Sequence, residues 1–131
     1  MITAGTGLAQ VAQYAQDLDR AAAFYERLLG APPLARFDPP GLLFFALGGG
    51  TRLLLEEGAS SALLYLKVDD VPTRIEELRA EGVVVEAEPH IIFSHTDDSL
   101  GPAGHDEWMA FIRDSEDNLV GLVSHAPRAE S

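Results

Sequence analysis

The same order of secondary-structure signals occurs twice in this chain, and such a repeat constrains the fold more than any single motif does. An alternating segment at 8–15 leads to Asp17, a good N-cap, and to a helical pattern that ends at Gly30. Two further strand-like runs follow at 42–47 and 51–57. We interpret the first half of the sequence as a β-α-β-β-β unit, in which these patterns locate the helix and three of the four strands.

The second half repeats this order after a short linker at 58–62. The run LLYLKV precedes Asp70, which caps a helix with Pro72 in its first turn, and Gly82 closes that helix. Setting Asp70 on Asp17 gives an internal repeat of about 50 residues. The runs VVVEAE, EWMAFIRD and NLVGLVSH complete the second unit. We expect one domain over 1–131, with modules at about 7–57 and 62–125.

Two local expectations follow for the second module. Helical spacing predicts that Ile75, Leu78 and Arg79 form the buried stripe of its helix. The segment 91–106 reads as a loop much longer than its counterpart in the first module, and long loops in compact domains are often functional. Its apolar beginning, at 91–93, predicts that this loop packs down over the protein.

Charge and composition exclude several function classes. A formal charge of −12 with no basic run argues against binding to nucleic acid, because phosphates would repel the chain. No apolar run is long enough to cross a membrane. The first ten residues carry no secretory signal and the chain has no cysteine, which together predict a cytoplasmic protein. The acidity is interpreted as a solubility feature or as attraction for a cationic ligand.

The segments DLDRAAAFYERLLG, LYLKVDDV and NLVGL resemble the vicinal oxygen chelate superfamily. That group includes glyoxalase I, bleomycin-resistance proteins and extradiol dioxygenases. The resemblance covers 7–125 and implies an α+β fold in which two βαβββ modules form a curved mixed sheet around a cleft, with the helices on the convex side. It also implies a homodimer. It does not fix the activity, because function resides in the site rather than in the fold.

Metal-using members of the superfamily take four ligands from the strands that open and close each module. The corresponding positions here are Gln10, Leu54, Leu63 and Gly121. A single amide oxygen does not hold a divalent ion, which generally needs several carboxylate or imidazole donors. We therefore expect no metal at these positions and no cofactor. An unusual metal site formed by His90, His95 and His105 on or beside the long loop stays open as an alternative. Nearby loop acids are Asp97, Asp98, Asp106 and Glu107.

Strand alternation predicts which side chains face the cleft. The expected ligand-binding residues come from strands of both modules and from the ends of the long loop: Gln10, Tyr14, Arg52, Glu56, Leu63, Tyr65, Lys67, His90, His105 and Trp108. This mixture of apolar, aromatic and polar groups is typical of a pocket for an organic ligand. His90 and His105 are also candidate general acids or bases, without an assigned catalytic role.

The sequence leaves three functions open. The first is binding of a small organic molecule without metal, including sequestration of an antibiotic-like or cationic compound. The second is a metal-independent lyase, isomerase or hydrolase. The third is a metal-dependent enzyme of the superfamily, such as a dioxygenase, with shifted ligands.

Overall fold

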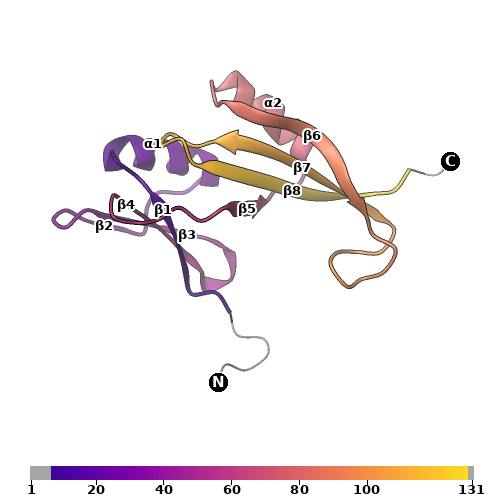
Figure 1. Cartoon of the computed structure of the whole chain (residues 1–131), viewed down its shortest axis with the longest axis horizontal. Helices are drawn as coiled ribbons and strands as arrows, with labels where there is room; N and C mark the ends of the chain where they lie inside the picture. The colour runs from indigo at the N-terminus through magenta and orange to yellow at the C-terminus, as the bar shows by residue number, and fades with distance from the viewer. Residues whose placement is uncertain (1–6, 130–131) are drawn as a thin grey trace. The chain divides into compact units, whose positions relative to one another are not determined.

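The computed structural model describes residues 7–129, and the chain divides between Ala62 and Leu63 into two compact units (Figure 1). Each unit holds one α-helix and one four-stranded sheet, which confirms the predicted α+β class and the repeated βαβββ order. Within the described residues, no helix is both long and apolar enough to span a membrane. The expectation of no secretory signal rests mainly on residues 1–6, which lie outside the described part.

The first unit is built around the sheet β1-β4-β3-β2. Its β1 and β4 strands are parallel, and the other two strand pairs are antiparallel. The strand β2 was not singled out by the sequence pattern. The elements in chain order are β1 (Gln10–Tyr14), α1 (Leu18–Leu29), β2 (Ala35–Phe37), β3 (Leu42–Ala46), the 3₁₀ turn η1 (Gly48–Gly50) and β4 (Arg52–Glu56).

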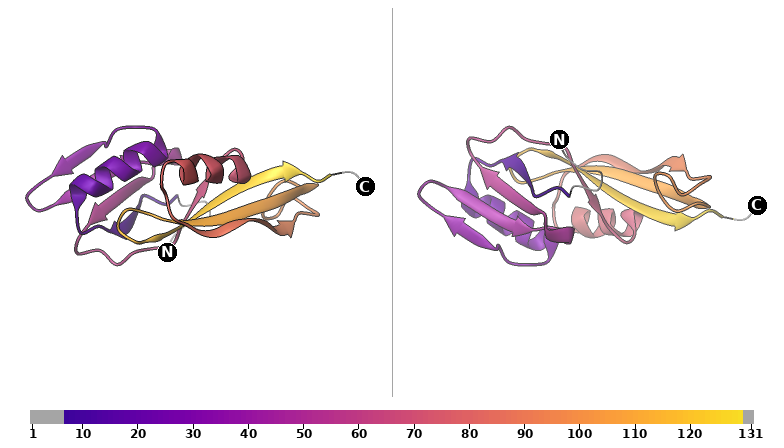
Figure 2. Two further views of the ribbon diagram at one scale, coloured as in Figure 1. Left: turned by 90° about the horizontal axis from the view of Figure 1, so that it is seen from above. Right: turned by 90° about the horizontal axis from the view of Figure 1, so that it is seen from below.

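Helix α1 forms where the sequence predicts it and covers one face of this sheet (Figure 2). The Asp17 carboxylate accepts a hydrogen bond from the backbone N–H of Arg20 at 3.0 Å, and Gly30 ends the helix with a φ of 72°. Ala21 and Tyr25 are fully buried on its inner side. The core of the first unit therefore lies between α1 and the sheet.

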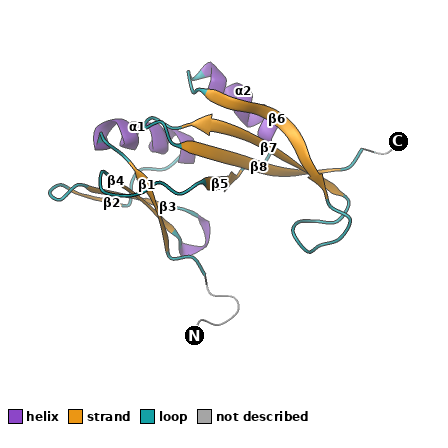
Figure 3. Cartoon of the chain, viewed as in Figure 1, coloured by secondary structure: helices purple, strands orange, loops and turns teal. Residues whose placement is uncertain are grey.

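The second unit repeats this plan with longer strands. Its sheet has the order β5-β8-β7-β6, in which β5 and β8 are parallel and the remaining pairs are antiparallel. Long β7 and β8 strands run side by side through the unit (Figure 3). The elements are β5 (Leu64–Lys67), α2 (Val71–Ala80), β6 (Val85–Ser94), β7 (His105–Arg113) and β8 (Leu119–Pro127).

Helix α2 is capped as predicted, but its buried stripe differs from the expectation. The Asp70 carboxylate accepts from the Thr73 N–H at 2.9 Å. Val71, Ile75 and Leu78 are buried, whereas Arg79 is exposed and forms an ion pair with Glu88 on β6. The expectation for Arg79 was wrong because a guanidinium at the margin of an apolar stripe stays in water and pairs with a carboxylate.

The predicted loop over 91–106 is shorter than expected. Residues 91–94 continue β6, and His105 and Asp106 begin β7. The remaining connection is closed by the His95 N–H donating to the His105 carbonyl at 2.9 Å and the Gly104 N–H donating to the His95 carbonyl at 2.8 Å. Ile91, Ile92 and Phe93 are 47%, 40% and 49% exposed on this edge strand, so the expectation that they pack down over the protein was wrong.

Candidate functional site

Four of the predicted site residues share one face of the first sheet. The parallel register of β1 and β4 sets Gln10 beside Arg52 and Tyr14 beside Glu56. These side chains point away from the face that α1 covers, where the intervening Gln13 is fully buried. The structure therefore brings Gln10, Tyr14, Arg52 and Glu56 together on one open surface, as strand alternation predicts.

This open surface is mainly apolar and aromatic. Leu54 pairs with Ala12 on one side and Phe44 on the other. The Arg52 guanidinium carbon lies 5.4 Å from the centre of the Phe44 ring, a cation–π arrangement. The Gln10 Oε1 atom is buried and has no hydrogen-bond partner among the described residues. Within the described part of the chain, the amide oxygen of Gln10 is thus an unpaired polar atom in mainly apolar surroundings.

An acidic hollow of about 630 Å³ adjoins Glu56. It lies between the start of α1, the β2–β3 hairpin and the end of β4. Arg36 donates to Asp19 at 2.7 Å and approaches Asp38 at 3.6 Å. Carboxylates outnumber guanidinium groups in its lining, which includes Asp17, Asp19, Arg20, Arg36, Asp38, Glu56 and Glu57.

In the second unit, aromatic rings fill the space beside Gly121. Tyr65 and Phe111 flank Gly121 in the sheet register, and their ring centres are 5.9 Å apart. A Cβ atom at position 121 would meet Tyr65 Cδ1 at 2.7 Å and Phe111 Cε1 at 3.1 Å. Lys67 lies further along the same face, beside Val123. Leu63 precedes β5 and is 46% exposed.

The other three predicted residues lie on β6 and β7. His90 is exposed on β6, where its Nδ1 lies 2.9 Å from the Glu88 carbonyl, and His105 Nδ1 lies 3.0 Å from the Ala103 carbonyl. Trp108 is paired with Ser124, whose hydroxyl accepts from the first N–H of α2 at 2.9 Å. Trp108 therefore lies on the helix-covered side of the sheet.

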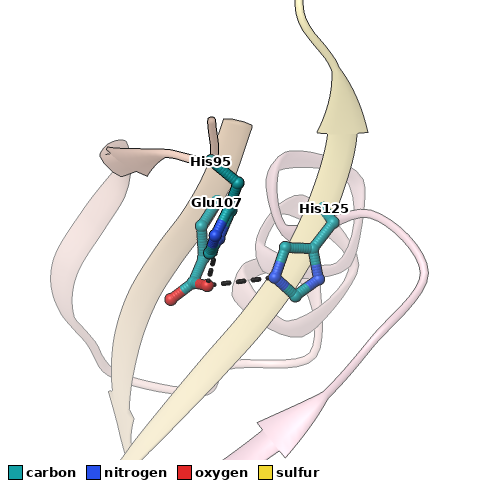
Figure 4. A group of neighbouring side chains, drawn as sticks. All are labelled: His95, Glu107 and His125. Carbon is teal, nitrogen blue, oxygen red and sulfur yellow. Dashed lines mark hydrogen bonds and ion pairs between the residues drawn. The ribbon is translucent and has the colours of Figure 1, made fainter. Parts of the chain in front are cut away.

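A different set of side chains converges beyond Tyr65 on the open face of this sheet. Glu107 on β7 and His125 on β8 are paired in register, and His95 directly follows β6. The Glu107 Oε1 atom lies 2.9 Å from His95 Nε2 and 3.0 Å from His125 Nε2 (Figure 4). One ligand atom from each residue lies within 4.8 Å of the others. We call these three residues the His-Glu-His cluster.

The cluster is well shielded from water. The side chains of His95, Glu107 and His125 are 2%, 18% and 20% exposed. Burial alone would raise the pKa of Glu107, but hydrogen bonds from both imidazoles and their charge outweigh it, so this pKa lies below its ordinary value. Glu107 is therefore a carboxylate at neutral pH.

The connection between β6 and β7 crosses the cluster at Gly101. A Cβ atom there would lie 2.8 Å from His95 Nε2 and 3.0 Å from His125 Nε2. The Phe93 ring packs edge-on against the His95 ring at a centre-to-centre distance of 4.8 Å. Glycine thus allows the loop backbone to approach the two imidazoles closely.

Sequence reasoning found His95 in this cluster but grouped it with His90 and His105. It missed His125 and gave Glu107 no role beyond that of a nearby loop acid. The cluster could have been found only from the register of β7 with β8, which pairs Glu107 with His125.

The fold and the sequence now identify the family. Residues 7–122 match the model of the glyoxalase/bleomycin resistance protein/dioxygenase superfamily. The chain belongs to this superfamily. None of the curated proteins matches the chain in sequence.

Several solved structures share the fold over nearly their whole length. Lactoylglutathione lyase from Agrobacterium tumefaciens is 24% identical, with a TM-score of 0.68 and coverage of 93% of this chain and 96% of that one. TnmS3, an antibiotic binding protein from Streptomyces sp. CB03234, is 22% identical, with a TM-score of 0.66 and coverage of 95% and 100%. A structure from the mobile metagenome of V. Pseudocholerae is 19% identical, with a TM-score of 0.70 and coverage of 95% and 98%.

The residues at the positions that the resemblance assigns to metal ligands do not supply a donor set for a metal ion. In the first unit they are Gln10 and Leu54, and in the second they are Leu63 and Gly121. Only Gln10 carries a side-chain donor atom, and aromatic rings occupy the space beside Gly121. One neutral amide oxygen is too few and too weak a donor set for a divalent ion.

Proposed function

We propose that this protein binds a small, cationic organic molecule on the open face of its first module, without a metal ion at the superfamily's usual positions. The observation that carries the proposal is the set of side chains at those positions. They supply one amide, that of Gln10, and otherwise an apolar surface. An apolar surface with a few polar groups is what an organic ligand needs for both affinity and orientation.

Charge supports a cationic ligand. The formal charge of −12 creates an attractive field for cations. The acidic hollow includes the Glu56 carboxylate, and Glu56 lies beside Tyr14 in the register of β1 and β4. A ligand with a flat apolar body and an amine can therefore contact both regions of the same unit. Structural similarity to an antibiotic binding protein is consistent with sequestration of an antibiotic-like compound.

Glu56 is the residue through which to test this proposal. Calorimetric titration should include a cationic aromatic dye, metal-free bleomycin and an aromatic carboxylate of similar size. We expect the protein to bind the dye, bleomycin or both, and we expect no binding of the carboxylate. The Glu56→Gln variant should bind that cation about five-fold more weakly, a loss of about 1 kcal/mol for one partly exposed charge pair.

Glu26→Gln provides a control with the same change of charge, because Glu26 is exposed on α1 and does not line the hollow. Its affinity for the cation should equal that of the unchanged protein. Equal weakening by both substitutions would indicate a general charge effect and contradict the proposed location. Failure of every cation to bind would overturn the proposed function.

A homodimer is part of this proposal. The exposed run of Ile91, Ile92 and Phe93 lies on β6, which is an edge strand of its sheet. Exposed apolar edge strands are surfaces that pair with another chain unless they are protected. We infer that a second copy covers this edge.

A second candidate function is a lyase, isomerase or dioxygenase of the same superfamily, working without metal or with shifted ligands. The His-Glu-His cluster favours it, because two imidazoles and a carboxylate are the donors that many catalytic metal sites use. Turnover of a thioester, hydroxy-carbonyl or catechol substrate, lost in Glu107→Gln and kept in Glu56→Gln, would favour this candidate over ligand sequestration.

A further inference from the structure

The His-Glu-His cluster combines donors from three separate segments at one point. The loop after β6, strand β7 and strand β8 each supply one side chain, and the donor atoms are imidazole nitrogens and a carboxylate oxygen. Two ligands bound to one ion at ~2.0–2.2 Å lie about 3.0–3.5 Å apart. The two separations in the cluster, 2.9 Å and 3.0 Å, are already close to that range.

The hydrogen bonds of the cluster share one acceptor atom, unlike those of an ordinary buried histidine. Both Nε2 atoms are directed at the same oxygen, Oε1 of Glu107, rather than at separate acceptors (Figure 4). A divalent cation between these three atoms would replace the two hydrogen bonds by three coordinate bonds, with each imidazole carrying its proton on Nδ1. Low exposure of all three side chains reduces competition from water.

The surroundings also suit a bound cation. Glu107 supplies a carboxylate oxygen between the two imidazoles, the kind of donor that offsets the charge of a cation. The guanidinium of Arg128 donates to the His95 carbonyl at 3.3 Å and lies 3.6 Å from the Asp106 carboxylate. The close approach of the loop at Gly101 encloses the donors without placing a side chain among them.

We propose that His95, Glu107 and His125 bind one divalent transition-metal ion of the zinc class. Imidazole and carboxylate select such ions over calcium or magnesium, which prefer oxygen-only sites. Three protein ligands leave a position open to water or to a ligand oxygen. This site uses none of the superfamily's usual ligand positions and lies entirely within the second unit. It also ties the β6–β7 loop to strands β7 and β8.

The proposal is tested with the full-length chain freed of any affinity tag and treated with chelator. Titration with Co²⁺, a coloured substitute for Zn²⁺, should produce visible absorption that saturates at one equivalent, and Zn²⁺ should then displace it. The variants His125→Ala and Glu107→Gln should bind Co²⁺ roughly 100-fold more weakly or not at all. Circular dichroism and the fluorescence of Trp108 establish that each variant is folded.

His90→Ala and His105→Ala are the matched controls, because they remove imidazoles from the same module outside the cluster. Both should bind Co²⁺ as tightly as the unchanged chain. Gly101→Ala keeps every ligand but places a Cβ against two of them, so we expect weaker binding. Saturation at one equivalent that is lost in His90→Ala or His105→Ala would overturn the assignment, as would the absence of any Co²⁺ absorption.

A measurement on the unchanged chain keeps the test independent of variant folding. The chain has four histidines, and Co²⁺ is paramagnetic. In the NMR spectrum, the imidazole signals of His95 and His125 should shift or broaden first, while those of His90 and His105 stay in place at one equivalent. Equal effects on all four imidazoles would mean non-specific binding and would contradict the proposal.

Discussion

At the scale of single residues, Gly121 is the position at which two aromatic rings meet. It has no side chain, and the structure shows which groups fill the space beside it. The rings of Tyr65 and Phe111 meet edge to face over the backbone at this point. This position has therefore become part of an aromatic cluster on the open face of the second sheet.

Gly121→Ala is expected to destabilise the protein by about 1–2 kcal/mol, because its Cβ would lie 2.7 Å from the Tyr65 ring and force that ring to move. Urea unfolding measures the change in the free energy of unfolding. In a Tyr65→Ala background, Gly121→Ala should lower the free energy of unfolding by clearly less, because the ring that the Cβ meets is absent. An equal cost in both backgrounds would contradict this account of the packing.

At the scale of elements, the strand β6 differs most from its sequence interpretation. The run that begins at Ile91 resembles the start of a packed loop, but it extends an edge strand beyond Pro89. Proline is tolerated on edge strands because its missing N–H need not join a ladder. The exposed apolar side chains that result give this edge its proposed role in dimer formation.

Ile92→Lys is expected to disrupt a dimer formed through β6, because a charged side chain on an edge strand opposes pairing. Light scattering after gel filtration should show twice the chain mass of 14.1 kDa for the unchanged protein and the single-chain mass for the variant. Leu34→Lys serves as the control, since Leu34 is 59% exposed in the first unit and outside this edge. A monomeric unchanged protein, or a dimer that survives Ile92→Lys, would contradict this role of β6.

At the scale of the whole molecule, the charge of −12 acts on stability and on ligand binding in opposite directions. Self-repulsion destabilises a compact chain with a large net charge, whereas the same field attracts a cation. Salt screens both effects, because the Debye length falls from about 10 Å at 0.1 M salt to about 3 Å at 1 M.

Raising NaCl from low to high concentration is therefore expected to increase the melting temperature and to weaken binding of a cationic ligand. Thermal unfolding and calorimetry on the same protein stock measure the two quantities. Sodium gluconate should act like NaCl, which separates screening from specific chloride binding. An increase of affinity with salt would indicate that apolar contact, rather than charge, dominates recognition.

The sequence alone determined the order of the helices and of every strand except β2, both helix N-caps and the family. These features depend on neighbours along the chain: Asp17 and Asp70 cap the N–H groups three residues later, and Gly30 supplies the positive φ that ends α1. The sequence also determined that Leu54, Leu63 and Gly121 carry no metal donor, because that is a property of residue type. Alternation was sufficient to group Gln10 with Tyr14 and Arg52 with Glu56.

The tertiary structure alone decided which residues meet across strands. Strand alternation gives each side chain a face but not a partner, and the partner depends on a register that is set by turns and bulges. The register of β7 with β8 brings Glu107 to His125, and the closed loop brings His95 to both. His90 and His105 have the same chemistry but lie outside the cluster, because a donor set is defined by distances between atoms far apart in the sequence.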